Sequence, residues 1–304
     1  MTGPAAPPPD APPPVRSGLL LGVGAYVIWG LLPLYLKLVS HVPALQVLAH
    51  RVLWSAAMLA VVVVALKRTR AILALATPRT ILMLATSALL IALNWLVYIW
   101  AIDHDHVLDA SLGYFINPLV NVALGVVVLG ERVRRVQGVA IALAAAGVAL
   151  LALASGGGLW ISLVLAFSFS FYGLIRKVAA IDALGGLLIE TFLLAPLALG
   201  VLLVAYGQGH SGFGQDRATD GLLVLAGAVT AAPLLMFAAA ARRMPYAALG
   251  LLQYIAPTLQ FSLAVFVFGE HLRPADIASF ALIWLGLAVY ATDGVRTARA
   301  VSRR

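Results

Sequence analysis

Long apolar runs separated by short polar segments recur along this chain of 304 residues and constrain what it can fold into. The first run, Leu19 to Val39, is followed by others of similar length. A bilayer core about 30 Å thick is crossed by about 20 helical residues, because each residue adds only about 1.5 Å. Hydrophobic residues make up 62% of the chain and charged residues 11%, which is too apolar for a soluble domain. We therefore predict a polytopic membrane protein.

The runs are continuous rather than alternating, which favours helices over the strands of a membrane β-barrel. The expected fold is all-α, with ten transmembrane helices arranged as two inverted repeats of five. The expected helices span 18–39, 43–66, 79–101, 107–129, 135–154, 158–178, 184–206, 219–240, 247–268 and 274–294.

Basic residues indicate how these helices are oriented. Lys and Arg that flank short loops stay on the cytoplasmic side. With the N-terminus inside, all 20 basic residues except Lys37, Arg51, Arg217 and Arg273 fall on that side, and acids collect in the outer loops. Both chain ends are therefore expected in the cytoplasm. The net charge of +8 is explained by these loops, so the lipid bilayer is the expected partner and nucleic acid is not.

Two segments 139 residues apart carry the same pattern. Tyr114-Phe-Ile-Asn-Pro118 and Gln253-Tyr-Ile-Ala-Pro257 are each followed, twelve positions after the proline, by Gly-Glu. The same offset pairs Asn121 with Gln260 and Gly147 with Gly286. Because each copy would contain five helices, the second copy enters the membrane upside down, as in alternating-access transporters.

The chain is therefore divided into four parts. The expected parts are a disordered Pro/Ala-rich tail at 1–15, a first repeat at 16–154, a second repeat at 155–295 and a basic tail at 296–304.

Polar and aromatic residues inside the predicted helices are candidates for a midplane solute site. Pro118 and Pro257 should kink their helices and free the carbonyls four residues earlier. Amides would hydrogen-bond a solute and aromatic rings would stack on it. Alternatively, the amides only join helices and the rings only mark the membrane interface. The substrate-binding candidates are Tyr26, Trp29, Asn94, Trp95, Tyr114, Asn117, Asn121, Gln253, Tyr254 and Gln260.

Charged residues inside the predicted helices are candidates for coupling. A charge in hydrocarbon costs at least about 2.5–3.5 kcal/mol, so His50, Arg51 and Glu190 should face the protein interior. Glu190 is the candidate for coupling transport to protons. Arg51 could instead extend toward the outer headgroups. A direct ion pair between Arg51 and Glu190 stays open, although their predicted depths differ.

Other polar features are interpreted as structural. Gly130 and Gly269 suit helix C-caps, and the Glu after each would complement the dipole of the next helix. Asp103-His104-Asp105-His106 has metal-binding residue types without ligand spacing, so a solvated loop is favoured and no metal is expected. The sequence contains no cysteine and no catalytic or nucleotide-binding motif, so neither an enzyme nor a cofactor is predicted.

Several segments of the chain resemble RarD-type proteins of the EamA branch of the drug/metabolite transporter superfamily. They are Pro33-Leu-Tyr-Leu-Lys37, Leu48-Ala-His-Arg51, Trp54-Ser55, Asn94-Trp95, the block from His106 to Leu119, Phe171 to Lys177, and Glu190-Thr191. The resemblance implies ten helices, a bacterial inner-membrane location and transport of small organic molecules. The family name is tied to chloramphenicol sensitivity. Asp109 stands where the resemblance implies Glu, and it is a further charge-coupling candidate.

A secondary transporter is therefore the leading functional prediction. A membrane enzyme or lipid-handling protein would place its chemistry in the acidic outer loops, and a non-transporting scaffold would not need symmetric prolines. Short loops favour transport over the first alternative. The sequence leaves the natural substrate, the direction of transport and the oligomeric state open.

Overall fold

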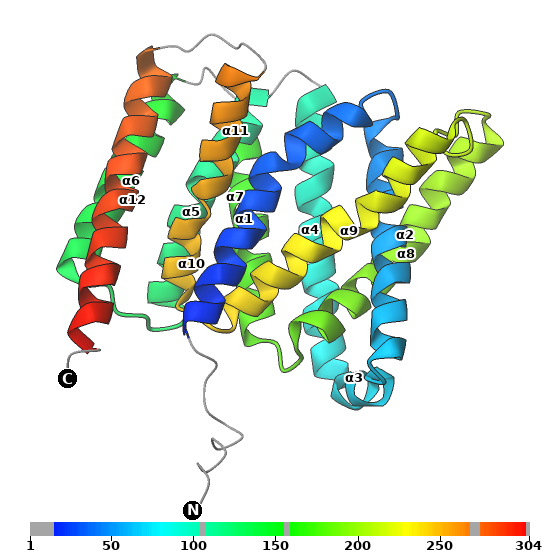
Figure 1. The fold of residues 1–304 in the computed structure, drawn as a ribbon, viewed down its shortest axis with the longest axis horizontal. Helices are drawn as coiled ribbons and strands as arrows, with labels where there is room; N and C mark the ends of the chain where they lie inside the picture. The colour runs from blue at the N-terminus through cyan, green and yellow to red at the C-terminus, as the bar shows by residue number, and fades with distance from the viewer. Residues whose placement is uncertain (1–14, 104–106, 155–158, 268–273, 302–304) are drawn as a thin grey trace, which may run out of the picture.

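A computed structural model describes residues 15–103, 107–154, 159–267 and 274–301 of this protein, and within these ranges all regular structure is helical (Figure 1). The helices are α1 (Val15–Leu38), α2 (Ala44–Ala65), α3 (Thr69–Leu75), α4 (Pro78–Asp103), α5 (Val107–Val127), α6 (Arg135–Ala154), α7 (Leu159–Val178), α8 (Ala183–Gly207), α9 (Arg217–Ala241), α10 (Tyr246–Leu252), α11 (Ile255–Phe266) and α12 (Pro274–Val301).

Each helix predicted from the apolar runs has a counterpart at nearly the same residues. There are two differences: α3 is an additional short helix, and the predicted helix at 247–268 is divided into α10 and α11. Within the described residues, α1, α2, α4, α7, α8 and α9 contain segments long and apolar enough to cross a membrane. The apolar segments of α5, α6 and α12 are shorter. The protein is thus an all-helical, polytopic membrane protein.

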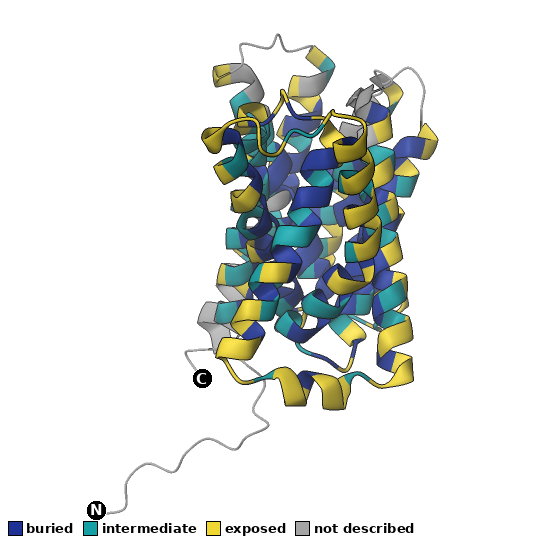
Figure 2. Ribbon diagram, turned by 90° about the vertical axis from the view of Figure 1, so that its right-hand side faces the viewer, coloured by how far each residue is buried: buried dark blue, intermediate teal, exposed yellow. Residues whose placement is uncertain are grey.

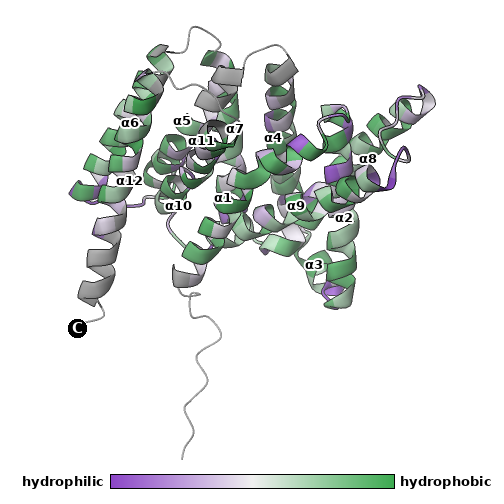
Figure 3. Ribbon diagram, turned by 45° about the horizontal axis from the view of Figure 1, so that its top comes forward, coloured by the Kyte–Doolittle hydropathy of each residue, from purple (hydrophilic) through white to green (hydrophobic). Residues whose placement is uncertain are grey.

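The helices run side by side, and both ends of the described chain lie at the same end of the bundle (Figure 1). The principal packing partners are α6 with α12, α5 with α7, and α2 with both α8 and α9. Buried residues fill the interior while exposed residues cover the outside (Figure 2). Much of that outside is apolar, including Leu20, Val61 and Leu197, each about two-thirds exposed or more, and the hydrophobic colouring extends along the helices (Figure 3). Such a surface suits contact with lipid chains.

Close helix packing at α6 and α12 depends on the two glycines that the sequence pairs at an offset of 139 residues. A Cβ atom at Gly147 would lie 2.7 Å from the carbonyl oxygen of Ser279 on α12. A Cβ atom at Gly286 would lie 2.6 Å from the carbonyl oxygen of Ala140 on α6. Small residues let two helix backbones approach in this way, which is how membrane helices commonly associate.

Acidic N-caps begin two of the long helices. The side chain of Asp182 accepts a hydrogen bond from the backbone N–H of Gly185 at the start of α8. Asp216 accepts from the N–H groups of Ala218 and Thr219 at the start of α9, and hydrogen bonds from Thr219 hold the pKa of the Asp216 carboxyl below its ordinary value. These bonds satisfy helix donors that otherwise have no partner.

Glu131 holds the start of α10. Gly130 adopts a φ of 67°, as predicted for a C-cap glycine. The carboxylate of Glu131 then accepts hydrogen bonds from the N–H groups of Tyr246 (2.7 Å) and Ala247 (2.9 Å), and Lys177 Nζ lies 3.8 Å away. The prediction that Glu131 serves the next helix is therefore wrong. The chain turn after α5 directs its carboxylate to α10, far along the sequence, instead of to α6.

The two prolines affect their helices differently. α5 continues through Pro118, whereas the chain is interrupted at Gln253 and Tyr254, just before Pro257. Pro257 lies in the first turn of α11, where its missing N–H matters little. The predicted free carbonyl at Gln253 is wrong, because that oxygen accepts a 3.2 Å hydrogen bond from the N–H of Ala256. A tighter turn replaces the bond that Pro257 removes.

Replacing Glu131 by Ala tests the importance of the α10 cap. The Glu131→Ala variant should lose about 1–2 kcal/mol of stability, because two buried N–H groups lose a charged acceptor. Thermal unfolding in detergent should therefore start at a lower temperature. Glu131→Gln keeps an acceptor oxygen, so its unfolding temperature should lie between those of the wild type and Glu131→Ala. Equal unfolding temperatures for wild type and Glu131→Ala would contradict the capping role.

Candidate functional site

A cavity of about 190 Å³ lies between α1, α2, α4, α5, α7, α9 and the α10–α11 break. On α1 its lining extends from Tyr26, near the middle of the helix, to Leu36, close to its C-terminal end. It is larger than the ~150 Å³ apolar cavity that is known to hold benzene. The predicted candidates that line it are Tyr26, Trp29, Asn94, Trp95, Tyr114, Gln253 and Gln260, together with Arg51 and Pro257.

Other predicted candidates lie between helices, outside the cavity lining. The Ser170 hydroxyl donates to Asn117 Oδ1, Asn121 Nδ2 donates to Gln253 Oε1 at 2.9 Å, and the Tyr254 hydroxyl donates to the carbonyl of Phe115 at 3.2 Å. These side chains join α5 to α7 and to the α10–α11 break. Pro118, His50 and Glu190 also lie outside the lining. Asp109 falls in α5, but its side chain lies outside the described residues.

The cavity amides are held by the surrounding helices. Asn94 Nδ2 donates to the carbonyl of Leu165 (2.9 Å) and to Ser168 Oγ (3.0 Å), both on α7. Gln260 Nε2 donates to the carbonyl of Trp29 at 3.1 Å, which ties α11 to α1. Because each amide has a fixed partner, its remaining polar atom is oriented by the fold rather than free to rotate.

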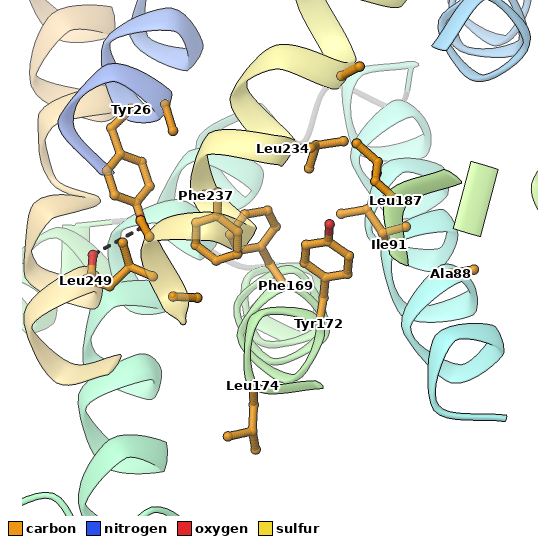
Figure 4. Packing of buried hydrophobic residues seen from close by; sticks show 14 of the residues in the cluster. Tyr26, Ala88, Ile91, Phe169, Tyr172, Leu174, Leu187, Leu234, Phe237 and Leu249 are labelled. Atoms are coloured by element: carbon orange, nitrogen blue, oxygen red, sulfur yellow. Dashed lines mark hydrogen bonds between the residues drawn. The ribbon is translucent and has the colours of Figure 1, made fainter. Parts of the chain in front are cut away.

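Aromatic rings of Tyr26, Phe169, Tyr172 and Phe237 gather in the interior of the bundle (Figure 4). Trp29 packs edge-to-face on Phe169, with ring centroids 5.7 Å apart, and Phe169 lies 5.4 Å from Phe237. Tyr172 stacks on Phe237 at 6.2 Å. The hydroxyl of Tyr26 donates to the carbonyl of Leu249 at 3.2 Å. This aromatic cluster (Tyr26, Trp29, Phe169, Tyr172 and Phe237) is largely buried, and its members Tyr26, Trp29 and Phe169 line the cavity.

Arg51 is the only charged side chain among the described residues that line the cavity. Its Nε donates to Thr230 Oγ1 at 2.8 Å, and its guanidinium carbon lies 5.5 Å from the ring centroid of Trp95. Tyr98 and Tyr114, whose rings are 5.7 Å apart, line the same cavity. A guanidinium over an aromatic face is favourable, and this contact retains Arg51 inside the protein.

His50, the neighbour of Arg51, faces a different environment. Its imidazole stacks on the ring of Phe213, with centroids 5.1 Å apart, in the connection between α8 and α9. Gln46, one turn earlier on α2, binds that connection through the carbonyl of His210 and the N–H of Gly212. His50 therefore packs under a loop at one end of the bundle.

Glu190 lies in a buried polar cluster on α8. Its Oε1 accepts a 2.6 Å hydrogen bond from Ser87 Oγ and lies 3.5 Å from Arg176 Nη1, and both charged side chains are at most 2% exposed. A direct pair between Arg51 and Glu190 is not formed. Glu190 Oε2 and the Tyr172 hydroxyl have no hydrogen-bond partner among the described residues. Both residues line a void of about 10 Å³, roughly the space of one water molecule.

The burial of Arg176 was not predicted from the sequence. Together with Lys177 this residue resembles a loop cation at a helix end, yet it is 1% exposed. Its Nη2 donates to the carbonyl of Ala183 at 2.8 Å, and Gly186 leaves room for its guanidinium. The sequence signal that could have located Arg176 inside the protein was Glu190, because a buried carboxylate needs a cationic partner. Thr230, Tyr98 and Phe169 were also not predicted, since a hydroxyl or a ring in an apolar run has no distinctive pattern.

Within the described residues, no three His, Cys, Asp or Glu side chains are grouped as metal ligands would be. In the Asp103–His106 segment, residues 104–106 lie outside the described residues.

Comparison with known proteins places this architecture in a family. Residues 16–153 match the model of the EamA-like transporter family. An uncharacterized transporter of Pseudomonas aeruginosa is 49% identical over 94% of this chain and 96% of its own length. Protein RarD of Escherichia coli is 46% identical over 95% of this chain and 98% of its own length. A crystal structure at 21% identity has the same fold, with a TM-score of 0.69 over 90% of this chain and 96% of the other.

The helical membrane fold and these relatives together define a membrane transporter. The chain belongs to the EamA-like transporter family, and within it to the RarD-type proteins. The resemblance that the sequence motifs indicated is thereby confirmed.

Proposed function

We propose that this protein is a secondary transporter of small organic solutes that binds its solute in the cavity and works by alternating access. The observation that carries this proposal is a cavity lined by aromatic rings, amides and one guanidinium inside a membrane transporter. Such pockets combine apolar walls with a few oriented polar groups. The RarD name is tied to chloramphenicol sensitivity, so chloramphenicol is one of the solutes to test.

Helix packing supports an arrangement of ten membrane helices in two inverted repeats, 16–154 and 155–295. If α7 corresponds to α1 and α10–α11 to α5, the contact of α1 with α11 matches that of α7 with α5. Likewise the contact of α1 with α9 matches that of α7 with α4, and α6 meets its own counterpart, α12. Matched contacts of this kind are expected from a two-fold axis in the membrane plane.

A bacterial inner-membrane location follows from the family and the apolar helices, and the basic loops support cytoplasmic chain ends. In that orientation the lining from Tyr26 to Leu36 lies on the outer half of α1, and the aromatic cluster would close the path toward the cytoplasm. Alternating access would then require this cluster to separate.

We also propose that Glu190 couples transport to protons. Its Oε2 has no partner among the described residues, and it borders a void that shares the lining residues Ile91, Trp95 and Leu234 with the cavity. A water in that void would connect the carboxylate to the solute site. The alternative is that Glu190 only stabilises the fold, through its ion pair with Arg176.

Filling the cavity should abolish transport. Solutes, chloramphenicol included, are first screened for thermal stabilisation of the detergent-solubilised protein, and those that bind are tested for saturable uptake into proteoliposomes. Ala256→Phe adds a ring to the cavity lining and should remove both binding and uptake. Ala57→Phe, the same change at an exposed position of α2, should leave both intact. Uptake that survives in Ala256→Phe, or no carried solute at all, would contradict the proposal.

Glu190→Gln keeps the shape and the Ser87 hydrogen bond of the side chain while removing its titration. If Glu190 carries the coupling proton, the variant should still fold and bind solute, but uptake should no longer respond to an imposed pH gradient. The rate of uptake is measured across a series of pH gradients in proteoliposomes. An unaltered response in Glu190→Gln would restrict this residue to a structural role.

A further inference from the structure

We infer that the cavity selects organic anions: solutes that combine a planar ring with one negatively charged group, such as a carboxylate. This inference rests on the proposed function, since it names the solute class of that same cavity. It follows from the position of Arg51, from the absence of a compensating acid in the described lining, and from the rings around the guanidinium.

Arg51 presents unused hydrogen-bond donors to the cavity. Only its Nε is engaged, by Thr230 Oγ1, and neither terminal nitrogen is hydrogen-bonded or ion-paired to a described residue. A guanidinium carries two terminal groups in one plane, which match the two oxygens of a carboxylate. The Nε contact and the Trp95 ring fix that plane. The geometry therefore provides a prepared pair of hydrogen-bond donors for a carboxylate.

Among the described residues, no acidic side chain pairs with Arg51 or lines its cavity. The other described lining residues are apolar, amide-bearing or aromatic. Glu190, on α8, already accepts a hydrogen bond from Ser87 and is ion-paired with Arg176. A cation inside a membrane protein is costly unless an anion accompanies it. A bound anionic solute would neutralise the cavity, whereas a cationic solute would be repelled.

The walls of the cavity define the rest of the solute. Trp29, Trp95 and Phe169 offer faces and edges on which a ring can stack, and Gln253 and Gln260 add amides to the lining. The volume of about 190 Å³ accommodates one ring with a short substituent, given that ~150 Å³ suffices for benzene. A ring seated between these walls would place its acidic group against Arg51.

Three probes of nearly equal shape isolate the effect of charge: benzoate, benzamide and benzylamine, which are anionic, neutral and cationic at pH 7. Affinities are measured by thermal shift and titration calorimetry on the full-length protein in detergent. Benzoate should bind about tenfold or more tighter than benzamide, and benzylamine more weakly than either. Arg51→Gln should remove the preference for benzoate, and Arg51→Lys should restore part of it.

Arg70→Gln, which removes an exposed cation on α3, is the matched control and should bind all three probes as wild type does. Equal affinities for benzoate and benzamide, a preference that persists in Arg51→Gln, or no binding of benzoate would overturn the anion inference. The proposed function is separable from this result. Saturable uptake of a neutral solute that Ala256→Phe abolishes would support transport while contradicting the anion preference.

Discussion

The interruption between α10 and α11 is the feature on which the rest of the site depends, and residues of the N-terminal half hold it in place. Glu131 caps the first turn of α10, Asn121 binds the side chain of Gln253, and Tyr254 binds the carbonyl of Phe115. A Cβ atom at Gly250 would lie 2.7 Å from that of Asn121, so α10 packs closely on α5. In a bilayer the backbone groups at such a break require protein partners, because lipid offers none.

The same requirement explains the polar interior. Charged and amide groups in the interior need protein partners, and several have them: Asn94 from α7, Gln260 from α1, and Glu190 Oε1 from Ser87 and Arg176. Arg51 differs, because its terminal donors have no hydrogen-bond partner among the described residues and the side chain lines the cavity. A half-buried cation within a membrane protein is expensive to retain, and the proposed role in solute binding would account for it.

The helices were predictable because their apolar runs have the length that a bilayer demands, and most cavity residues followed from polar or aromatic side chains inside those runs. The misassignments share a physical cause, since tertiary packing decides where a side chain points. Glu131 reaches a helix distant in sequence, and Arg176 turns inward although its position resembles a loop. Asn117, Asn121 and Tyr254 were predicted as solute-binding candidates inside membrane helices, but a position inside a helix does not distinguish a helix contact from a cavity wall.

The central claim is that the cavity is a water-accessible solute path. Because the chain contains no cysteine, Gln260→Cys introduces a single thiol into the lining, and Leu197→Cys places one on the exposed apolar face of α8. The decisive measurement is the modification rate by a charged, water-soluble thiol reagent in proteoliposomes. Gln260→Cys should react, lose transport on reaction and be protected by a carried solute, while Leu197→Cys should react much more slowly. A Gln260→Cys thiol that reacts no faster than Leu197→Cys, or that reacts without affecting transport, would contradict the account.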